Sequence, residues 1–384
     1  MAALGAAESR IHHNFHPTTD LKMVRHTDGC SRAVPELYTL KPLVLPLRMR
    51  ILTRAALKRL AVLFAIVGAL ILWSWWSMIR MPLKSFRGPL PALTAEQGVA
   101  RDALRRHVEK LAGEIGERNV FKPDKLRAAA DYIEGAFTNA GYKVNRQAYT
   151  VLRETCHNLE AELKGKSLSD EIVVVGAHYD SVSGSPGAND NGSGIAAVLE
   201  LARIWAGRTP ARTVRFVAFV NEEPSFFQTE QMGSFVYARQ CRQRNEKIVA
   251  MLSLETIGYY STAKGSQKYP FPVGLFYPSR GDFIAFVGNR ANARLVRRCI
   301  ASFRRQASFP SEGAALPGRL PGIDWSDHWS FWQAGYPGIM VTDTAPFRYP
   351  HYHTEQDTPD KLDYERIARV VAGLDKVLED LVNQ

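Results

Sequence analysis

The chain has 384 residues, of which 46% are hydrophobic and 23% are charged, and this is the ordinary composition of a folded protein too long for one small domain. The formal net charge is +11, and residues 1–59 hold ten Lys/Arg against four acidic residues, so over half of the excess precedes a hydrophobic segment. No basic stripe interleaved with aromatics and no zinc-finger spacing occurs, which excludes a nucleic-acid surface and indicates a membrane-topology signal instead.

Residues 1–47 have mixed polarity and no sustained periodicity, which predicts a disordered tail or a segment outside the mature protein. Met49 opens a start-like sequence, MRILTRAALKRL, and is an alternative translation start. We therefore predict a basic, disordered cytoplasmic tail over residues 1–59.

A run of 20 apolar, uncharged residues follows, from Leu60 to Ile79. This length is what a helix needs to cross the hydrocarbon layer, and the tryptophans at 73, 75 and 76 lie at one end, where aromatics favour the interface. The N-terminal flank is richer in Lys/Arg than the C-terminal one, which predicts a cytoplasmic N-terminus and a periplasmic or extracellular bulk. The alternative is a cleaved signal peptide, which would normally be shorter and followed by an A-x-A-like site.

Residues 80–95 are proline-rich and are interpreted as a linker to a soluble domain over residues 96–384. Four apolar residues share one face of a helix expected to begin after Thr94: Leu104, Val108, Leu111 and Ile115. A second helix is expected near residues 126–140. Both are predicted to pack against a core.

Further along, apolar runs that favour strands alternate with helical stretches. Strands are expected at 171–177, 213–220, 248–255, 273–277 and 337–343. Helices are expected at 193–206, 231–243, 289–306 and 361–382. Near-continuous apolar strands are typical of a sheet covered on both faces. The predicted fold class is α/β, with a mixed, mainly parallel central sheet flanked by helices and preceded by one transmembrane helix.

The four cysteines, Cys30, Cys156, Cys241 and Cys299, are far apart and form no CxxC motif. Three of them fall in the soluble domain. Two alternatives remain open: one disulfide plus one free thiol, or three unpaired buried thiols.

Side chains that can bind metals follow the predicted strands. His178 and Asp180 follow the run 171–177, Glu222 and Glu223 follow 213–220, and Glu255 ends 248–255. The carboxyl ends of parallel strands meet in one crevice, so these groups should lie close together. The glycine-rich loop 184–194 can add Asp190, and the segment 351–354 can add a histidine.

Imidazoles together with carboxylates are typical of zinc, cobalt or manganese sites. Two histidines and three carboxylates exceed the needs of one tetrahedral zinc and suit two divalent metal ions about 3.5–4 Å apart. One carboxylate must stay off the metals to move protons, and the adjacent Glu222 and Glu223 can divide these roles.

Six separated segments resemble the zinc aminopeptidases of clan MH, family M28, a family that also contains the glutaminyl cyclases. They are HYDS (178–181), GANDNGSG (187–194), NEE (221–223), SLETIG (253–258), SDH (326–328) and HYHTEQDT (351–358). The likeness runs from about residue 105 to about residue 382. It implies an enzyme that cuts residues from peptide N-termini with two zinc ions.

The resemblance also implies roles for single residues. The implied metal ligands are His178, Asp190, Glu223, Glu255 and His353, with Asp190 bridging both ions. Glu222 is implied to be the general base, and Asp180 to orient the ring of His178. His353, rather than His351, matches the last ligand because Thr-x-x-Asp-Thr follows it. A cis peptide between Asp190 and Asn191 is implied as well.

Asp327 and His328 are implied to lie near the site, either with a role there or as a structural hydrogen-bonded pair. Glu255 stands where the family more commonly has Asp, and Pro224 with Phe226-Phe227 stands where glycine is frequent, so we expect a reshaped pocket for the first side chain. Two alternative functions remain: a one-zinc glutaminyl cyclase, or a non-catalytic binding ectodomain. Non-catalytic members of such a family lose metal ligands, whereas this chain keeps them.

Overall fold

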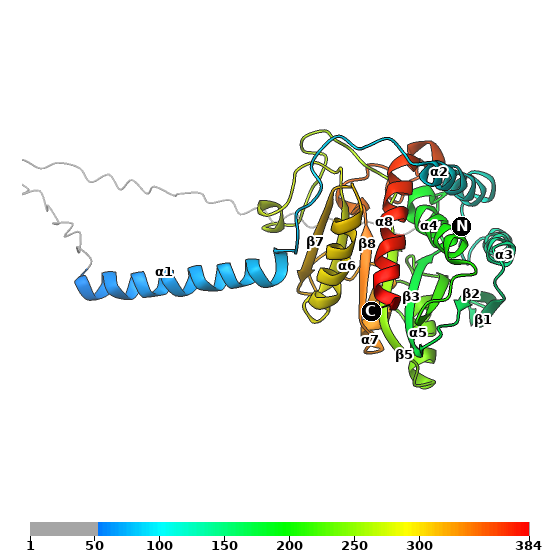
Figure 1. Ribbon diagram of the computed structural model, residues 1–384, viewed down its shortest axis with the longest axis horizontal. Helices are drawn as coiled ribbons and strands as arrows, with labels where there is room; N and C mark the ends of the chain where they lie inside the picture. Colours follow the sequence, from blue (N-terminus) through cyan, green and yellow to red (C-terminus); the bar gives the residue numbers. More distant parts are fainter. Residues whose placement is uncertain (1–52, 384) are drawn as a thin grey trace, which may run out of the picture. The chain divides into compact units, whose positions relative to one another are not determined.

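The computed structural model describes residues 53–383 (Figure 1). The chain divides into two units, Met1–Lys58 and Arg59–Gln384. The predictions for the first 52 residues, including the disordered tail, the alternative start at Met49 and the state of Cys30, lie outside the described residues.

The first described element is a long apolar helix. Helix α1 (Arg54–Ser74) has no buried residue and continues as a π-helical segment, Trp75–Ile79. Together these 26 residues are long and apolar enough to cross a membrane, judged by length and composition. Among residues 53–383 this is the one helix with that property.

The proline-rich segment 80–94 forms no helix or strand, yet it is held against the domain. Arg304 donates through Nη1 to the backbone carbonyls of Pro82 (3.1 Å) and Leu83 (3.0 Å). A free spacer would leave these carbonyls to water, so we call this segment an ordered strap.

Eight strands form one mixed sheet in the order β1-β2-β4-β3-β5-β8-β6-β7. Their bounds are β1 Val144–Val151, β2 Glu154–Leu163, β3 Leu168–His178, β4 Arg212–Phe219, β5 Lys247–Glu255, β6 Ile284–Asn289, β7 Ser311–Leu316 and β8 Gly338–Thr342. Strands β4, β3, β5 and β8 are parallel neighbours, whereas β1, β2 and β6 each run antiparallel to a neighbour. The predicted mixed, mainly parallel sheet is confirmed.

Helices cover both faces of this sheet. They are α2 Ala95–Val108 with a π-helical continuation to Ile115, α3 Pro123–Asn139, α4 Gly194–Trp205, α5 Gly233–Gln243, α6 Ala293–Gln306, α7 His328–Gln333 and α8 Tyr364–Asn383. Along β3, Val173 and Val175 pack in the core that holds α4, α6 and α8, which lie over the sheet in Figure 1. Ile172 and Val174 pack in the core with α5 and α7. This alternation explains why the central strands carry apolar residues on both faces.

The strand expected at 273–277 is wrong. Residues Val273–Leu275 form a single 3₁₀ turn. The flanking Pro270 and Pro272 lack backbone N–H groups, so the segment cannot complete a strand ladder. Conversely, the strands at 144–151, 154–163, 284–289 and 311–316 were not predicted, and they form the two outer parts of the sheet.

The three cysteines of the soluble domain are unpaired. Cys156 on β2, Cys241 on α5 and Cys299 on α6 are free and buried. Of the two alternatives from the sequence, that of three buried thiols therefore holds.

Candidate metal centre

The ends of three neighbouring strands and two loops bring the five expected ligands together. His178 is the last residue of β3, and Glu255 is the last residue of β5. Glu223 follows β4, Asp190 precedes α4, and His353 lies in the connection between β8 and α8. Because β3, β4 and β5 are parallel neighbours, their carboxyl ends open on the same edge.

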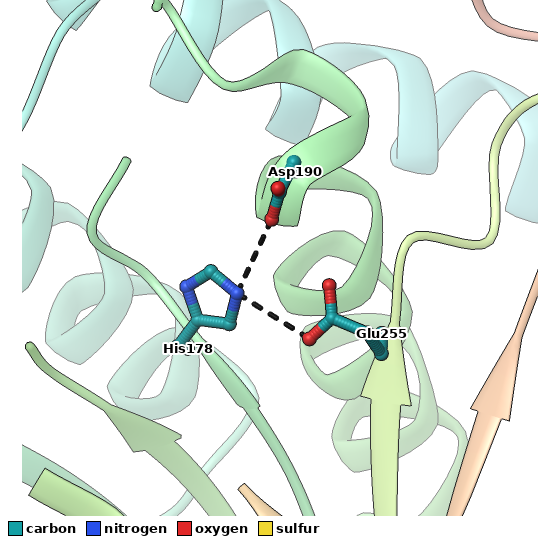
Figure 2. A group of neighbouring side chains, drawn as sticks. All are labelled: His178, Asp190 and Glu255. Atoms are coloured by element: carbon teal, nitrogen blue, oxygen red, sulfur yellow. Dashed lines mark ion pairs between the residues drawn. The ribbon is translucent and has the colours of Figure 1, made fainter. Parts of the chain in front are cut away.

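One group consists of His178, Asp190 and Glu255 (Figure 2). Nε2 of His178 lies 3.3 Å from Oδ1 of Asp190 and 3.4 Å from Oε2 of Glu255. Figure 2 shows the imidazole edge directed at both carboxylates. All three residues are buried, so few water molecules compete for their ligand atoms.

A second group consists of Asp190, Glu223 and His353. Nε2 of His353 lies 3.0 Å from Oδ2 of Asp190 and 3.2 Å from Oε2 of Glu223. Asp190 thus belongs to both groups and presents a different oxygen to each. His351 belongs to neither group; its ring lies edge-on to Tyr349, with ring centres 5.4 Å apart.

Both groups fit divalent cations. In each, three ligand atoms lie within 4.8 Å of one another. Nε2 of His178 and Nε2 of His353 are buried and have no hydrogen-bond partner among the described residues. A buried ring nitrogen without a partner is costly, and a cation would satisfy it. Imidazole and carboxylate donors match zinc, and a three-ligand set leaves a position open.

Asp180 positions both sides of the centre. Its Oδ1 lies 3.5 Å from Nδ1 of His178, and its backbone oxygen lies 3.2 Å from the same nitrogen. The Asp180 carboxylate also accepts hydrogen bonds from the backbone N–H groups of Glu222 (3.2 Å) and Glu223 (3.1 Å). One side chain therefore orients the histidine ring and fixes the loop that carries both glutamates.

The centre holds more acidic than basic groups, and the pKa values reflect this. Burial raises the pKa of Glu222 well above its ordinary value, and the charges of Glu255 and Glu223 add to the effect. Burial likewise raises the pKa of Glu223 to about 7. Burial lowers the pKa of His353, but the nearby carboxylates of Asp190 and Glu223 outweigh it and raise the pKa to about 10. Bound cations would relieve this crowding of negative charge.

Asp357 was given no role from the sequence, although the motif that selected His353 contains it. Its carboxylate accepts hydrogen bonds from the backbone N–H groups of Asn189 (2.8 Å) and Asp190 (3.0 Å). It also accepts one from the hydroxyl of Tyr349 (2.9 Å). Asp357 therefore holds the backbone that places Asp190 between the two groups.

We predict that Asp357→Asn weakens zinc binding by roughly 10- to 100-fold, the usual cost of losing a residue that supports a ligand. The amide keeps one acceptor oxygen and cannot satisfy both backbone donors. Competition with a coloured chelator measures the affinity. Tyr349→Phe is the matched control, because it removes one hydrogen bond and leaves the carboxylate, so a smaller loss is expected. Unchanged zinc affinity in Asp357→Asn would contradict the role.

Arg118 and the glycines shape the loop around Asp190. The buried Arg118 donates to the backbone oxygens of Tyr179 (2.6 Å) and Gly187 (2.8 Å). At Gly187 φ is +63°, and a Cβ there would clash with the backbone carbonyl oxygen of Asp190. Glycine is therefore required at this position. The Asp190–Asn191 peptide is cis, as the resemblance implies.

Asp327 and His328 do not form the hydrogen-bonded pair considered from the sequence. Both carboxylate oxygens of Asp327 are buried without a hydrogen-bond partner in the described part of the chain. Nε2 of His328 lies 2.8 Å from the backbone oxygen of Ile323 instead. Burial raises the pKa of Asp327 to about 7 and lowers that of His328 to about 4. The alternative of a structural hydrogen-bonded pair is therefore wrong.

Sequence comparison identifies the family. The model of peptidase family M28 matches residues 158–377. The chain is also 38% identical over 282 residues to the uncharacterized protein YfbL of Escherichia coli strain K12, covering 71% of this chain and 86% of YfbL. The chain belongs to peptidase family M28. A probable leucine aminopeptidase 1 of Trichophyton verrucosum is 29% identical over 299 residues, 72% of this M28 chain and 73% of the relative.

Solved structures share the fold of this M28 member. BSAP, a zinc aminopeptidase from Bacillus subtilis, aligns with a TM-score of 0.60 at 16% identity, over 77% of this chain and 97% of BSAP. A glutaminyl cyclase from Fimbriiglobus ruber aligns with a TM-score of 0.55 at 21% identity, over 78% of this chain and 99% of the cyclase. At these identities the likeness establishes the architecture that both kinds of protein use.

Proposed function

We propose that this M28 member hydrolyses N-terminal residues from peptides at a centre of two divalent ions, zinc being the metal that its donor set suits best. One observation carries the proposal: the two oxygens of Asp190 face different histidines, Oδ1 at 3.3 Å from His178 and Oδ2 at 3.0 Å from His353. A carboxylate shared in this way is the arrangement that two ions require. His178 and Glu255 would hold one ion, and Glu223 and His353 the other.

When bound, two such ions polarise a carbonyl and make an attacking water more acidic. The protein's own contribution to the reaction is then Glu222. Its Oε2 lies 3.8 Å from Nε2 of His178, and it belongs to neither ligand group. Burial raises its pKa, which makes the carboxylate a stronger proton acceptor than a solvated glutamate. We assign Glu222 to take the proton of the attacking water and return it to the leaving amine.

A pocket beside the centre can receive the first side chain of the peptide. Glu255 and Tyr352, which neighbours His353, stand at one end of it, and most of its other lining residues are apolar. Phe226 and Phe227 do not line it; Phe226 stacks on Phe121 with ring centres 6.5 Å apart. The expectation that residues 224–227 reshape the pocket for the first side chain stays a prediction.

Metal content and product analysis test the proposal against its alternatives. The full chain, purified in detergent with and without zinc, is assayed with aminoacyl amides and with a glutaminyl peptide. Two ions per chain together with amino-acid release would support the aminopeptidase. One ion and a cyclised product would favour the glutaminyl cyclase. Bound ions without turnover of either substrate would favour the non-catalytic ectodomain.

For the N-terminal part we propose a cytoplasmic tail (1–59), a membrane span (60–79) and a linker (80–95), with the M28 domain (96–384) periplasmic or extracellular. The support is the length, apolarity and exposure of α1 and the charge asymmetry of its flanks.

The anchor yields a further prediction. The full chain should stay in the membrane fraction after alkaline carbonate extraction. Placing arginine at Ile66 and Leu70 should release much of it, because each charge at mid-span costs about 2.5–3.5 kcal/mol. Val99→Arg is the matched control, since this apolar residue is exposed on the domain and outside the span. A mature mass lacking the first 80 or so residues would show instead that the segment is a cleaved signal peptide.

A further inference from the structure

The geometry points to Glu312 as the residue that makes this enzyme select peptides whose first residue is lysine or arginine. The inference rests on the proposed aminopeptidase function and specifies its substrate class. It places the N-terminal side chain in the pocket beside the metal centre, with its cation at the Glu312 carboxylate.

The floor of the pocket is a row of paired residues that crosses four strands. Glu255 pairs with Thr342, Thr342 with Ala285, and Ala285 with Glu312. All four residues line the pocket. Adjacent strands lie about 4.8 Å apart, so three steps put the α-carbons of Glu255 and Glu312 about 14 Å apart. The floor therefore leads from the metal centre straight to a second carboxylate.

The remaining floor and walls of the pocket are mostly apolar or small and carry no charge. A second row of paired residues, Met340, Val287 and Ala314, runs beside the first and also lines the pocket. Ala285 and Ala314 leave space above the sheet that larger side chains would fill. Glu255 and Glu312 are the charged side chains among the lining residues, and they stand at opposite ends of the floor. One of them serves the metal centre, which leaves Glu312 to meet the end of a long side chain.

Glu312 has capacity to bind a cation. Its closest charged neighbour is Nη2 of Arg304 at 3.6 Å. Four of the five N–H groups of that guanidinium donate elsewhere, to the carbonyls of Pro82 and Leu83 and to the hydroxyl and carbonyl of Ser311, so Arg304 can offer at most one of them to Glu312. Among residues 53–383 no group donates a hydrogen bond to the Glu312 carboxylate, and its side chain is 22% exposed. It can accept charge-assisted hydrogen bonds from a ligand.

Lysine and arginine match this pocket from end to end. Their methylene stems can lie along the apolar floor while the charged head reaches the carboxylate. A neutral chain of equal length fills the same floor and leaves Glu312 without a donor. The side chain of an acidic first residue would bring a like charge to Glu312.

The test compares substrate pairs that differ in charge and share the stem: lysine against norleucine amide, and arginine against citrulline amide. Wild-type enzyme should show higher kcat/KM for the charged member of each pair. Glu312→Gln should lower the lysine-to-norleucine ratio of kcat/KM by roughly 10- to 100-fold, which is the contribution of a hydrogen bond to a charged group. The kcat/KM for norleucine amide should stay unchanged. Glu312→Asp should restore part of the ratio. Glu379→Gln, an exposed carboxylate on α8, should leave it unaltered.

Three outcomes would overturn the inference, and they are distinguishable. A ratio that does not fall in Glu312→Gln removes the selectivity role. A parallel fall for lysine and norleucine, with a lowered melting temperature, makes Glu312 a structural partner of Arg304. In both cases the aminopeptidase itself stands. Release of no amino acid from any of the four amides by zinc-loaded wild-type enzyme instead contradicts the proposed function, and the inference falls with it.

Discussion

Replacing Glu222 with glutamine is expected to lower kcat by roughly 10²–10⁴-fold, the usual contribution of a general base. The amide has nearly the same shape as the carboxylate but cannot take up a proton. Glu222 lies outside both ligand groups, so the variant should keep the same number of bound ions as the wild type. Turnover of an aminoacyl amide and metal content on the same preparation measure the two effects.

Glu230→Gln is the matched control, because this exposed carboxylate follows the same strand and belongs to neither ligand group. It should leave kcat unaltered. Wild-type turnover in Glu222→Gln would remove Glu222 from the mechanism. Loss of one ion in that variant would reassign Glu222 as a ligand and leave the base to be found elsewhere.

Replacing Asp190 with asparagine is expected to abolish both metal binding and activity. Each oxygen of Asp190 serves one group, and an amide offers one oxygen and no negative charge. A cation that binds the folded state raises stability by mass action, so zinc should raise the melting temperature of the wild type and not that of Asp190→Asn. Metal analysis and a thermal melt with and without zinc provide the measurement.

Glu223→Gln is the informative comparison for Asp190, because Glu223 belongs to the His353 group alone. It should leave one ion per chain, held by the His178 group. If Asp190→Asn retained two ions, Asp190 would not bridge them, and the two groups would have to be independent sites. A drop to one ion in both variants would mean that Asp190 serves the same single ion as Glu223.

The central part of the fold could be predicted because its signals are local. The runs that became β3, β4, β5 and β8 are nearly continuous in apolar residues, as is typical of strands covered on both faces. Of the outer strands, β6 is also an apolar, buried run and was missed, whereas β1, β2 and β7 carry no such signal. β1 and β2 form a hairpin that mixes buried and exposed positions, and β7 is built mostly from small residues. None of these three strands therefore stands out from a loop in the sequence. The opposite error, a strand predicted at 273–277, arose because the apolar residues there resemble a strand. Pro270 and Pro272, which precede them, prevent one from forming.

The metal centre, too, was partly predictable from local sequence and partly not. That His178, Glu223 and Glu255 share one edge could be expected, because strand ends point the same way in any parallel sheet. That Asp357 supports Asp190 could not be expected, because the two residues are 167 positions apart and meet through loops.

The sequence by itself determined the central strands, the apolar N-terminal segment and the residue types gathered at the carboxyl edge, since each depends on neighbours along the chain. Only the tertiary structure decided how the ligands divide around Asp190, where the strap lies and which residues form the pocket floor. The row from Glu255 to Glu312 exists because four strands far apart in sequence pair in one register. Such a register is set by long-range packing, and no local pattern encodes it.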